Sequence, residues 1–352
     1  MNSFSFTIPQ NIVVGAGSLK RLPELAKNLK KSKAYIISGP HLEKIGMVDK
    51  CREALKAAGI ESDAFTQTEG NPSTDTVAKA AEGFKSSNAD FIVAFGGGSP
   101  LDVAKAVAVI ASYGGNITDY EGGGKVPGPV VPMIAIPTTA GTGSEVTAFS
   151  VITDHSRNYK LTVVSNYLLP AYAILDPELI TTVPKSTAAA CGIDAMVHAL
   201  EAFISKAASP FSDLFAKEAL RLIGTNIRDY VLDRSNLAAC EAMLTGSLFA
   251  GIAFSHARLG DVHAMSHPVS AYFDVAHGVA NAVLLPTIVD YNMTYASEKY
   301  KYIYDCICEK PLSDDAFTPE MLAAEIRVLN DELGIPSSLS EVGVDSSLFD
   351  KM

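Results

Sequence analysis

The sequence predicts an α/β domain with a mostly parallel sheet followed by an all-α domain, and three observations support this. The first half alternates short apolar runs with helical patterns, as parallel strands joined by helices do. The second half contains long amphipathic helical patterns and few convincing strands. The chain has 352 residues, more than a single hydrophobic core usually contains. We therefore expect a boundary near Val183, with domains over 1–183 and 184–352.

Three predicted strands of the first half end in glycine-bearing turns. They lie in the runs KAYIISGP (33–40), ADFIVAFGGGSP (89–100) and PMIAIPTTAGTGSE (132–145). Parallel strands present their carboxyl ends at one edge of a sheet, where such sheets bind ligands. We expect all three turns to lie at that edge.

The second half begins with long predicted helices. The clearest patterns are STAAACGIDAMVHALEAFIS (186–205), DLFAKEALRLIGTNIRDYVL (213–232) and LAACEAMLTGSLFAGIAFSHA (237–257). Pro184 and Ser186 are residues that commonly begin a helix, so they favour a helix start directly after the predicted domain boundary.

The glycine turn after the second of these strands is suited to a nucleotide. Gly96, Gly97 and Gly98 stand between a predicted strand and a predicted helix, where backbone amides and the positive end of the helix could cradle a pyrophosphate. Ser99 adds a hydroxyl, and Asp102 can anchor the first helical turn. The usual GxGxxG fingerprint is absent, so a plain tight turn is the alternative.

The turn after the third strand offers a second wall for the same ligand. Its hydroxyls and glycines would allow hydrogen bonds and close backbone approach, although a polar surface loop would have a similar composition. The candidate cofactor contacts in this turn are Thr138, Thr139, Thr142 and Ser144. We therefore expect the first domain to bind a dinucleotide.

The second domain carries an acid and four histidines with the spacing of a metal site. Asp194 and His198 are four positions apart on one helical face, and His263 and His267 repeat that spacing. His277 lies further along the chain, where Gly278 permits a turn, while Pro268 is expected to disturb the helix that carries His263. A carboxylate with imidazoles suits Fe²⁺ or Zn²⁺ better than Mg²⁺ or Ca²⁺. Buried core histidines are the alternative interpretation.

His256 is left open by the sequence. It precedes His263 by one or two turns on what is predicted to be the same helix, where it would lie in an outer layer of the metal site, in a substrate pocket or on the surface.

Composition and charge narrow the function class. A net charge of −11 and the lack of a basic cluster argue against binding to nucleic acid or acidic membranes. The start of the chain lacks a signal-peptide pattern, and no apolar stretch of about 18 residues runs without a charge or turn signal. Five cysteines without a CxxC pair suit a reducing compartment. We expect a cytoplasmic protein that acts on small molecules.

Taken together, these motifs resemble the iron-containing (group III) alcohol dehydrogenase family, which has a dehydroquinate synthase-like fold. The resemblance spans almost the whole chain and rests on five motifs: Gly96–Ser99 with Asp102, Pro137–Glu145, Asp194–His198, His263–Pro268 and Ala276–Gly278. It implies four metal ligands, which are Asp194, His198, His263 and His277. It also implies cofactor contacts at Asn71, Gly97, Gly98, Ser99, Thr138, Thr139, Thr142 and Lys160.

The resemblance implies hydride transfer between NAD(P)(H) and a small primary alcohol or aldehyde. The metal, Fe²⁺ or Zn²⁺ as the alternative, would lower the pKa of the substrate hydroxyl. His267 resembles a nearby histidine that is not a ligand and assists proton transfer, and we expect it to be catalytic. Phe149, Val151, Phe254 and His256 are candidate pocket residues that would admit a small substrate without selecting one. Relatives are often dimers or larger, so we expect a homodimer or larger homo-oligomer.

Two departures from the family pattern bear on this expectation. Many relatives carry an acid at the end of the second strand, which repels a ribose 2′-phosphate, whereas this chain has Gly39 there. We therefore expect contact with the cofactor at Gly39 and use of NADP(H), although no arginine beside it provides a phosphate clamp. The sequence also stops at SLFDKM, where relatives usually continue through another helical stretch, and this could weaken domain packing or assembly.

Three other functions would fit parts of the sequence. A zinc-dependent glycerol dehydrogenase would have the same fold, but the full set of Asp194, His198, His263 and His277 favours the iron branch. A dehydroquinate synthase-type lyase would need a basic cluster near the metal motifs, where Arg258 stands almost alone. A metal-binding protein without catalytic activity would not need the glycine and threonine turns.

Overall fold

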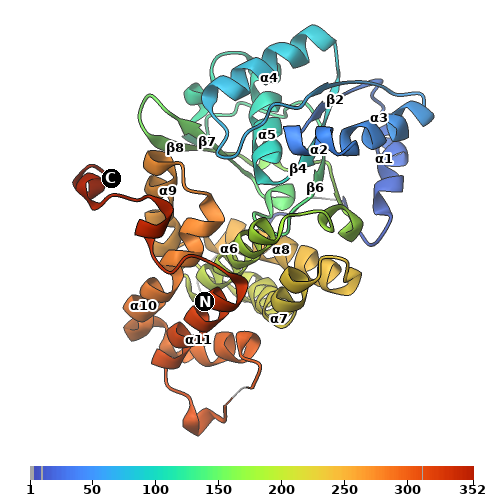
Figure 1. Ribbon diagram of the computed structural model, residues 1–352. Coiled ribbons are helices and arrows are strands. Elements are labelled where there is room, and N and C mark those ends of the chain that lie inside the picture. The colour runs from blue at the N-terminus through green and yellow to red at the C-terminus, as the bar shows by residue number, and fades with distance from the viewer. Residues whose placement is uncertain (1–3, 9–10, 311) are drawn as a thin grey trace. The chain divides into compact units, whose positions relative to one another are not determined.

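The computed structural model describes residues 4–8, 11–310 and 312–352. The chain packs into two compact units (Figure 1). The sheet unit comprises Thr7–Thr139 and Ser144–Leu179, and the helical unit comprises Met1–Phe6, Ala140–Gly143 and Ile180–Met352. The expected domains at 1–183 and 184–352 stay a prediction, because compact packing does not test whether each part folds by itself.

The sheet unit is built on a six-stranded sheet in which every pair of neighbouring strands is parallel. In spatial order the strands are β1 (Asn11–Val14), β9 (Tyr172–Leu175), β6 (Met133–Pro137), β4 (Phe91–Gly96), β2 (Lys33–Ile37) and β3 (Glu61–Phe65). The predicted parallel sheet is confirmed. A second sheet, not foreseen from the sequence, joins β5 (Gly122–Gly123), β8 (Tyr159–Val164) and β7 (Phe149–Asp154), with β7 and β8 antiparallel.

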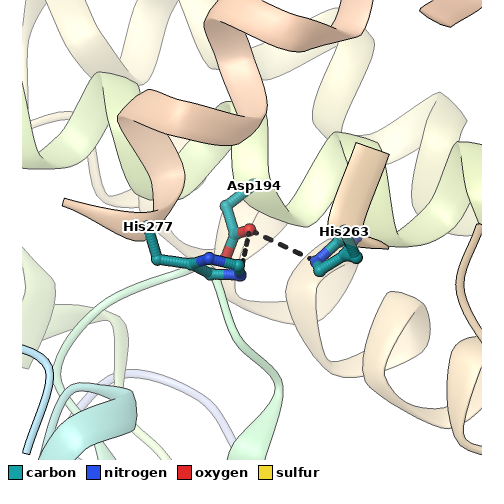
Figure 2. Close-up of side chains that lie close together, drawn as sticks. All are labelled: Asp194, His263 and His277. Atoms are coloured by element: carbon teal, nitrogen blue, oxygen red, sulfur yellow. Dashed lines mark ion pairs between the residues drawn. The ribbon is translucent and has the colours of Figure 1, made fainter. Parts of the chain in front are cut away.

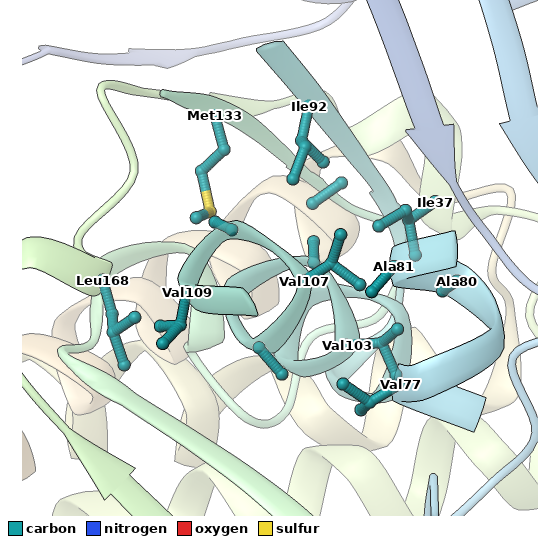
Figure 3. Close-up of a cluster of buried hydrophobic side chains, with 14 of the residues drawn as sticks. Ile37, Val77, Ala80, Ala81, Ile92, Val103, Val107, Val109, Met133 and Leu168 are labelled. Atoms are coloured by element: carbon teal, nitrogen blue, oxygen red, sulfur yellow. The ribbon is translucent and has the colours of Figure 1, made fainter. Parts of the chain in front are cut away.

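Helices cover both faces of the parallel sheet, which explains why its central strands β2, β4 and β6 are apolar and buried at nearly every position. The helices are α1 (Leu22–Asn28), α2 (Pro40–Lys44), α3 (Met47–Ala57), α4 (Thr74–Ser87) and α5 (Gly98–Tyr113). Alternate residues of β4 enter different cores: Phe91, Val93 and Phe95 pack with α1, α2 and α3. Ile92 and Ala94 pack on the opposite face with α4 and α5, as Figure 3 shows for Ile92.

The strand order reverses beside β2, and the glycine turns lie near this point of reversal. Strand β2 lies between β3 and β4, although it precedes both in the sequence, and β6 follows β4 in the sheet. The turns after β2, β4 and β6 therefore leave neighbouring strands at one edge. In open α/β sheets, ligands bind at this edge beside the point of reversal.

The helical unit has no strand among its described residues, as predicted for the second half. Its helices are α6 (Lys185–Ile204), α7 (Pro210–Leu232), α8 (Leu237–Ala257), α9 (Asp261–Phe273), α10 (His277–Ile307) and α11 (Glu320–Leu333). Helices α6, α7 and α8 pack against one another (Figure 1). By length and hydropathy, α6 and α8 could each span a membrane, but 83% and 67% of their apolar windows are buried inside the protein. Core helices pass the same test.

Two local expectations were wrong. Helix α9 runs through Pro268 without interruption. Proline removes the N–H that would bond to the carbonyl of Ala264, but Ala264 is exposed, so that carbonyl can bind water instead. His256 does not share a helix with His263, because α8 ends before Arg258, whose φ of 67° breaks the helical path, and α9 begins after Gly260.

Candidate metal centre

Helix α6 presents three ionisable side chains on one face inside the helical unit. Asp194, His198 and Glu201 are each at most 4% exposed. Their spacing of four and three positions places them one turn apart along the same stripe. Burying such groups is costly unless each one has a polar partner, so their neighbours on other helices matter.

Three donor atoms from three helices converge at this face (Figure 2). They are a carboxylate oxygen of Asp194, a ring nitrogen of His263 on α9 and a ring nitrogen of His277 on α10, and all lie within 4.8 Å of one another. Oδ1 of Asp194 is 3.9 Å from Nε2 of His263 and 3.7 Å from Nε2 of His277. These separations suit donors that share one divalent ion, whose bonds to nitrogen and oxygen are about 2.0–2.2 Å.

His198 lies beside this group. Its Nε2 is 3.0 Å from Nε2 of His263, and its Nδ1 is 3.8 Å from Oδ2 of Asp194. The ring stacks on Phe254 of α8 with ring centroids 4.5 Å apart. The structure thus brings together all four predicted ligands, with an apolar wall behind His198.

Glu201 was not anticipated from the sequence. Its Oε2 lies 2.6 Å from Nδ1 of His263, and its Oε1 accepts the backbone N–H of Val262 at 2.7 Å. Burial raises the pKa of the Glu201 carboxyl, and backbone N–H groups at the start of α9 partly oppose this. A carboxylate that accepts Nδ1–H leaves the lone pair of the imidazole on Nε2, the atom that faces Asp194 and His277.

Asn281 is a second polar residue that was missed. It is fully buried on α10, and its amide nitrogen approaches the same donor atoms. Both omissions had a signal in the sequence: Glu201 follows His198 by three positions and Asn281 follows His277 by four. Each therefore shares a helical face with a predicted ligand.

His267 lies one turn after His263 on α9 and is half-buried. Its ring centroid is 6.0 Å from that of His263 and 5.3 Å from that of His277. It is therefore beside the convergent donors without being one of the three. Its catalytic role stays a prediction.

His256 and Phe254, two of the expected pocket residues, point to different surroundings. Phe254 contacts His198 as described, whereas the His256 ring stacks on Phe6 with centroids 4.1 Å apart. His256 thus packs against the beginning of the chain. The expected pocket residues of the sheet unit, Phe149 and Val151, both lie on β7.

The predicted nucleotide turn of the sheet unit joins β4 to α5. Gly97 is the N-cap of α5 and Gly98 its first residue, followed by Ser99. A Cβ atom at position 97 would lie 3.1 Å from Oγ1 of Thr139, so the turns after β4 and β6 approach closely. The backbone N–H of Thr138 also donates to the carbonyl of Gly96 at 2.9 Å. The N-terminal amides of α5 have no capping side chain from Gly97, which suits an anion.

Asp102 on α5 and Ser144 after β6 are joined by a hydrogen bond next to these turns. The Ser144 hydroxyl donates to Oδ1 of Asp102 at 2.6 Å, and the buried Lys105 donates to the Ser144 hydroxyl at 2.9 Å. Burial lowers the pKa of Lys105 to about 8 and raises that of the neighbouring Glu145 to about 7. Direct contact of Asp102 and Ser144 with a cofactor stays a prediction, since both already make hydrogen bonds inside the protein.

The remaining predicted cofactor residues are spread over both units. Asn71 adopts a φ of 49° and its side chain accepts a hydrogen bond from Nζ of Lys160 at 2.7 Å. Gly39 is the N-cap of the short helix α2, directly after β2. Thr142 belongs to the segment Ala140–Gly143 of the helical unit.

The donor set of the helical unit fits the predicted metal. One carboxylate and the imidazole nitrogens of His198, His263 and His277 form the combination that Fe²⁺ and Zn²⁺ accept. Glu201 also fixes the ring of His263 in the form that can bind a cation.

Family models and known proteins match this chain over nearly its whole length. Residues 9–177 match the family model described as iron-containing alcohol dehydrogenase, and residues 188–352 match the C-terminal model of the same family. The NAD-dependent methanol dehydrogenase of Bacillus methanolicus is 36% identical over 97% of this chain and 90% of its own length. The NADPH-dependent butanol dehydrogenase of Clostridium saccharobutylicum is 36% identical over 98% of this chain and 88% of its own. A crystal structure of 1,3-propanediol oxidoreductase is 38% identical, has a TM-score of 0.94, and aligns over 99% of this chain and 92% of its own.

Proposed function

Because the chain belongs to the iron-containing alcohol dehydrogenase family, we propose that it transfers hydride between NAD(P)(H) and a small primary alcohol or aldehyde, with Fe²⁺ as its native metal. The observation that carries this proposal is the convergence of Asp194, His263 and His277 from three helices on one buried point. Zn²⁺ suits the same donors and is the alternative metal.

Different residues of the helical unit would bind the metal, orient its ligands and transfer the proton. Asp194, His198, His263 and His277 would hold it, and Glu201 would keep Nε2 of His263 directed at it. When bound, the cation would act as a Lewis acid that lowers the pKa of a substrate hydroxyl and polarises an aldehyde carbonyl. The half-buried His267 would carry the proton between the substrate and solvent.

The sheet unit would bind the cofactor. The start of α5 and the turn after β6 would receive the pyrophosphate, and Asn71 with Lys160 would contact the rest of the nucleotide. Gly39 carries no charge to repel a 2′-phosphate, so NADP(H) should be accepted as well as NAD(H). The two relatives support this breadth, because one is described as NAD-dependent and the other as NADPH-dependent.

We also propose a cellular location and an oligomeric state. The cysteine pattern, which suits a reducing compartment, supports a cytoplasmic location, and the family resemblance supports a homodimer or larger homo-oligomer.

The decisive experiment measures NADH and NADPH oxidation with short aldehydes, using metal-free protein reloaded anaerobically with Fe²⁺ or Zn²⁺. We expect oxidation that depends on the metal, and its loss in His263→Ala. His155→Ala is the matched control, because His155 is an exposed residue in the turn between β7 and β8. Protein that binds metal stoichiometrically and oxidises neither cofactor with any aldehyde would overturn the proposal.

A further inference from the structure

Asn281 is a polar residue whose complete burial requires an explanation. It is 0% exposed, on α10 and one turn after the proposed ligand His277. A buried amide without hydrogen bonds destabilises a protein, so buried amides are found where they have partners. The partners of the Asn281 amide nitrogen are atoms of the metal centre, whereas its amide oxygen is buried without a hydrogen-bond partner among the described residues.

The amide nitrogen of Asn281 faces three of these atoms at once. Nδ2 lies 2.6 Å from Oδ1 of Asp194, 3.2 Å from Nε2 of His263 and 3.2 Å from Nε2 of His277. The contact with Asp194 is the shortest, and its partner is an ionisable carboxylate, so it is the strongest of the three. The imidazole nitrogens nearest to the Asp194 carboxylate lie 3.7–3.9 Å away, beyond hydrogen-bonding distance.

The orientation of this amide follows from chemistry. A flipped amide would place the Asn281 oxygen against the carboxylate oxygen of Asp194, where neither atom can donate. The nitrogen must therefore face the carboxylate. Since an amide nitrogen is a donor with no available lone pair, in this orientation Asn281 would act on the metal through Asp194 and would not be a ligand itself.

We infer that Asn281 is a positioning residue of the metal centre, whose amide N–H fixes the carboxylate of Asp194 for the cation. The inference rests on the proposed function, because it assigns Asp194 as a ligand. The ligand His277 and the group that orients the ligand Asp194 would then be carried on one rigid helix, α10, one turn apart. Removing the amide should let the carboxylate rotate and should weaken metal binding by about 10–100-fold.

The chain offers a matched control in Asn330 on α11. Asn330 is 7% exposed, and its Nδ2 donates to the backbone carbonyl of Ala282 at 2.8 Å. It thus bonds to α10 beside Asn281 without donating to a ligand side chain. Asn330→Ala removes a buried amide and one hydrogen bond to the same helix, which is the structural part of the loss in Asn281→Ala.

The test titrates metal-free protein with Co²⁺ and follows the visible d–d absorption, with a competing chelator for the dissociation constant. Asn281→Ala should bind Co²⁺ about 10–100-fold more weakly and show an altered band, because coordination geometry changes. Asn330→Ala should stay within about threefold of the wild type with the same band. Thermal unfolding of both metal-free variants shows whether their stabilities are comparable.

A second variant separates loss of the amide from misfolding. Asn281→Thr has a similar volume, and its hydroxyl bonds to the backbone of its own helix, so it fills the core without reaching Asp194. It should show the same loss of Co²⁺ affinity. Equal or tighter binding in the folded Asn281 variants, with an unchanged band, would overturn the inference alone. A wild-type protein that binds no Co²⁺ would overturn the proposed metal centre and the inference with it.

Discussion

Oε2 of Glu201 and Nδ1 of His263 lie 2.6 Å apart, and both side chains are almost fully buried. The pair joins the last turn of α6 to the start of α9, where the other oxygen of Glu201 accepts the N–H of Val262. One carboxylate thus caps a helix and fixes the ring of a proposed metal ligand. The position of His263 therefore depends on a residue with no direct contact to the metal.

Replacing Glu201 should weaken metal binding more than it lowers the stability of the fold. In Glu201→Gln the side chain keeps its shape but loses the charge that strengthens the bond to His263, so metal affinity should fall by about tenfold. In Glu201→Ala the cap of α9 is also lost, at a cost of about 1–2 kcal/mol in the free energy of unfolding. Chelator competition and thermal unfolding measure the two effects. Unchanged metal affinity in both variants would contradict this role.

Gly278 should tolerate no side chain. A Cβ atom there would lie 2.5 Å from the backbone carbonyl oxygen of Ala190 on α6, and a backbone atom cannot easily move away. Gly278→Ala should shift the first turn of α10, which carries His277, and so reduce both stability and metal content. Gly123→Ala is the control, because a Cβ there meets nothing within 4 Å. Equal melting temperatures and equal metal content in the two variants would show that α10 is not held this closely.

The sequence predicted the four candidate ligands, through helical spacing and the family resemblance, and it missed the polar side chains that hold these ligands in place. Asp194 and His198 were visible because helical spacing alone places them on one face. Glu201 stands on the same face, but its role appears only when α9 approaches α6. The antiparallel pairing of β7 and β8 was missed for the same reason, since strand partners are set by tertiary contacts.

Glu145 should make stability depend on pH below neutrality. Burial raises the pKa of its carboxyl from 4.5 to about 7, so the folded state binds more protons than the unfolded state between these values. The free energy of unfolding should therefore fall as pH rises from 4.5 to 7, by about 3 kcal/mol at most. Glu145→Gln should flatten this slope in denaturant titrations, whereas Glu61→Gln, at an exposed carboxylate, should keep it. Parallel slopes in all three proteins would exclude Glu145 as the source.

His267→Ala tests the proposed proton transfer. The ring lies 5.3 Å from that of His277 and outside the three convergent donors, so metal content should be unchanged. Loss of a general acid–base group should lower kcat by about 10²–10⁴-fold and remove an ionisation from the pH profile. Metal analysis of the same sample separates this from loss of a ligand. Unchanged turnover and an unchanged pH profile would remove His267 from the mechanism.

Gly39 should decide the choice of cofactor. A carboxylate at this position would repel the 2′-phosphate of NADP(H) and could accept a hydrogen bond from the 2′-hydroxyl of NAD(H). Gly39→Asp should therefore lower kcat/KM for NADPH by about tenfold or more, against a smaller change for NADH. A Cβ at position 39 would lie 3.2 Å from the carbonyl oxygen of Thr68, a tight contact that any replacement shares. Gly39→Ser makes this contact without adding a charge, so it separates steric from electrostatic effects. A wild-type protein with a strong preference for NADH over NADPH would contradict this prediction. Equal changes in kcat/KM for both cofactors in Gly39→Ser and Gly39→Asp would also show that the charge at position 39 does not set the preference.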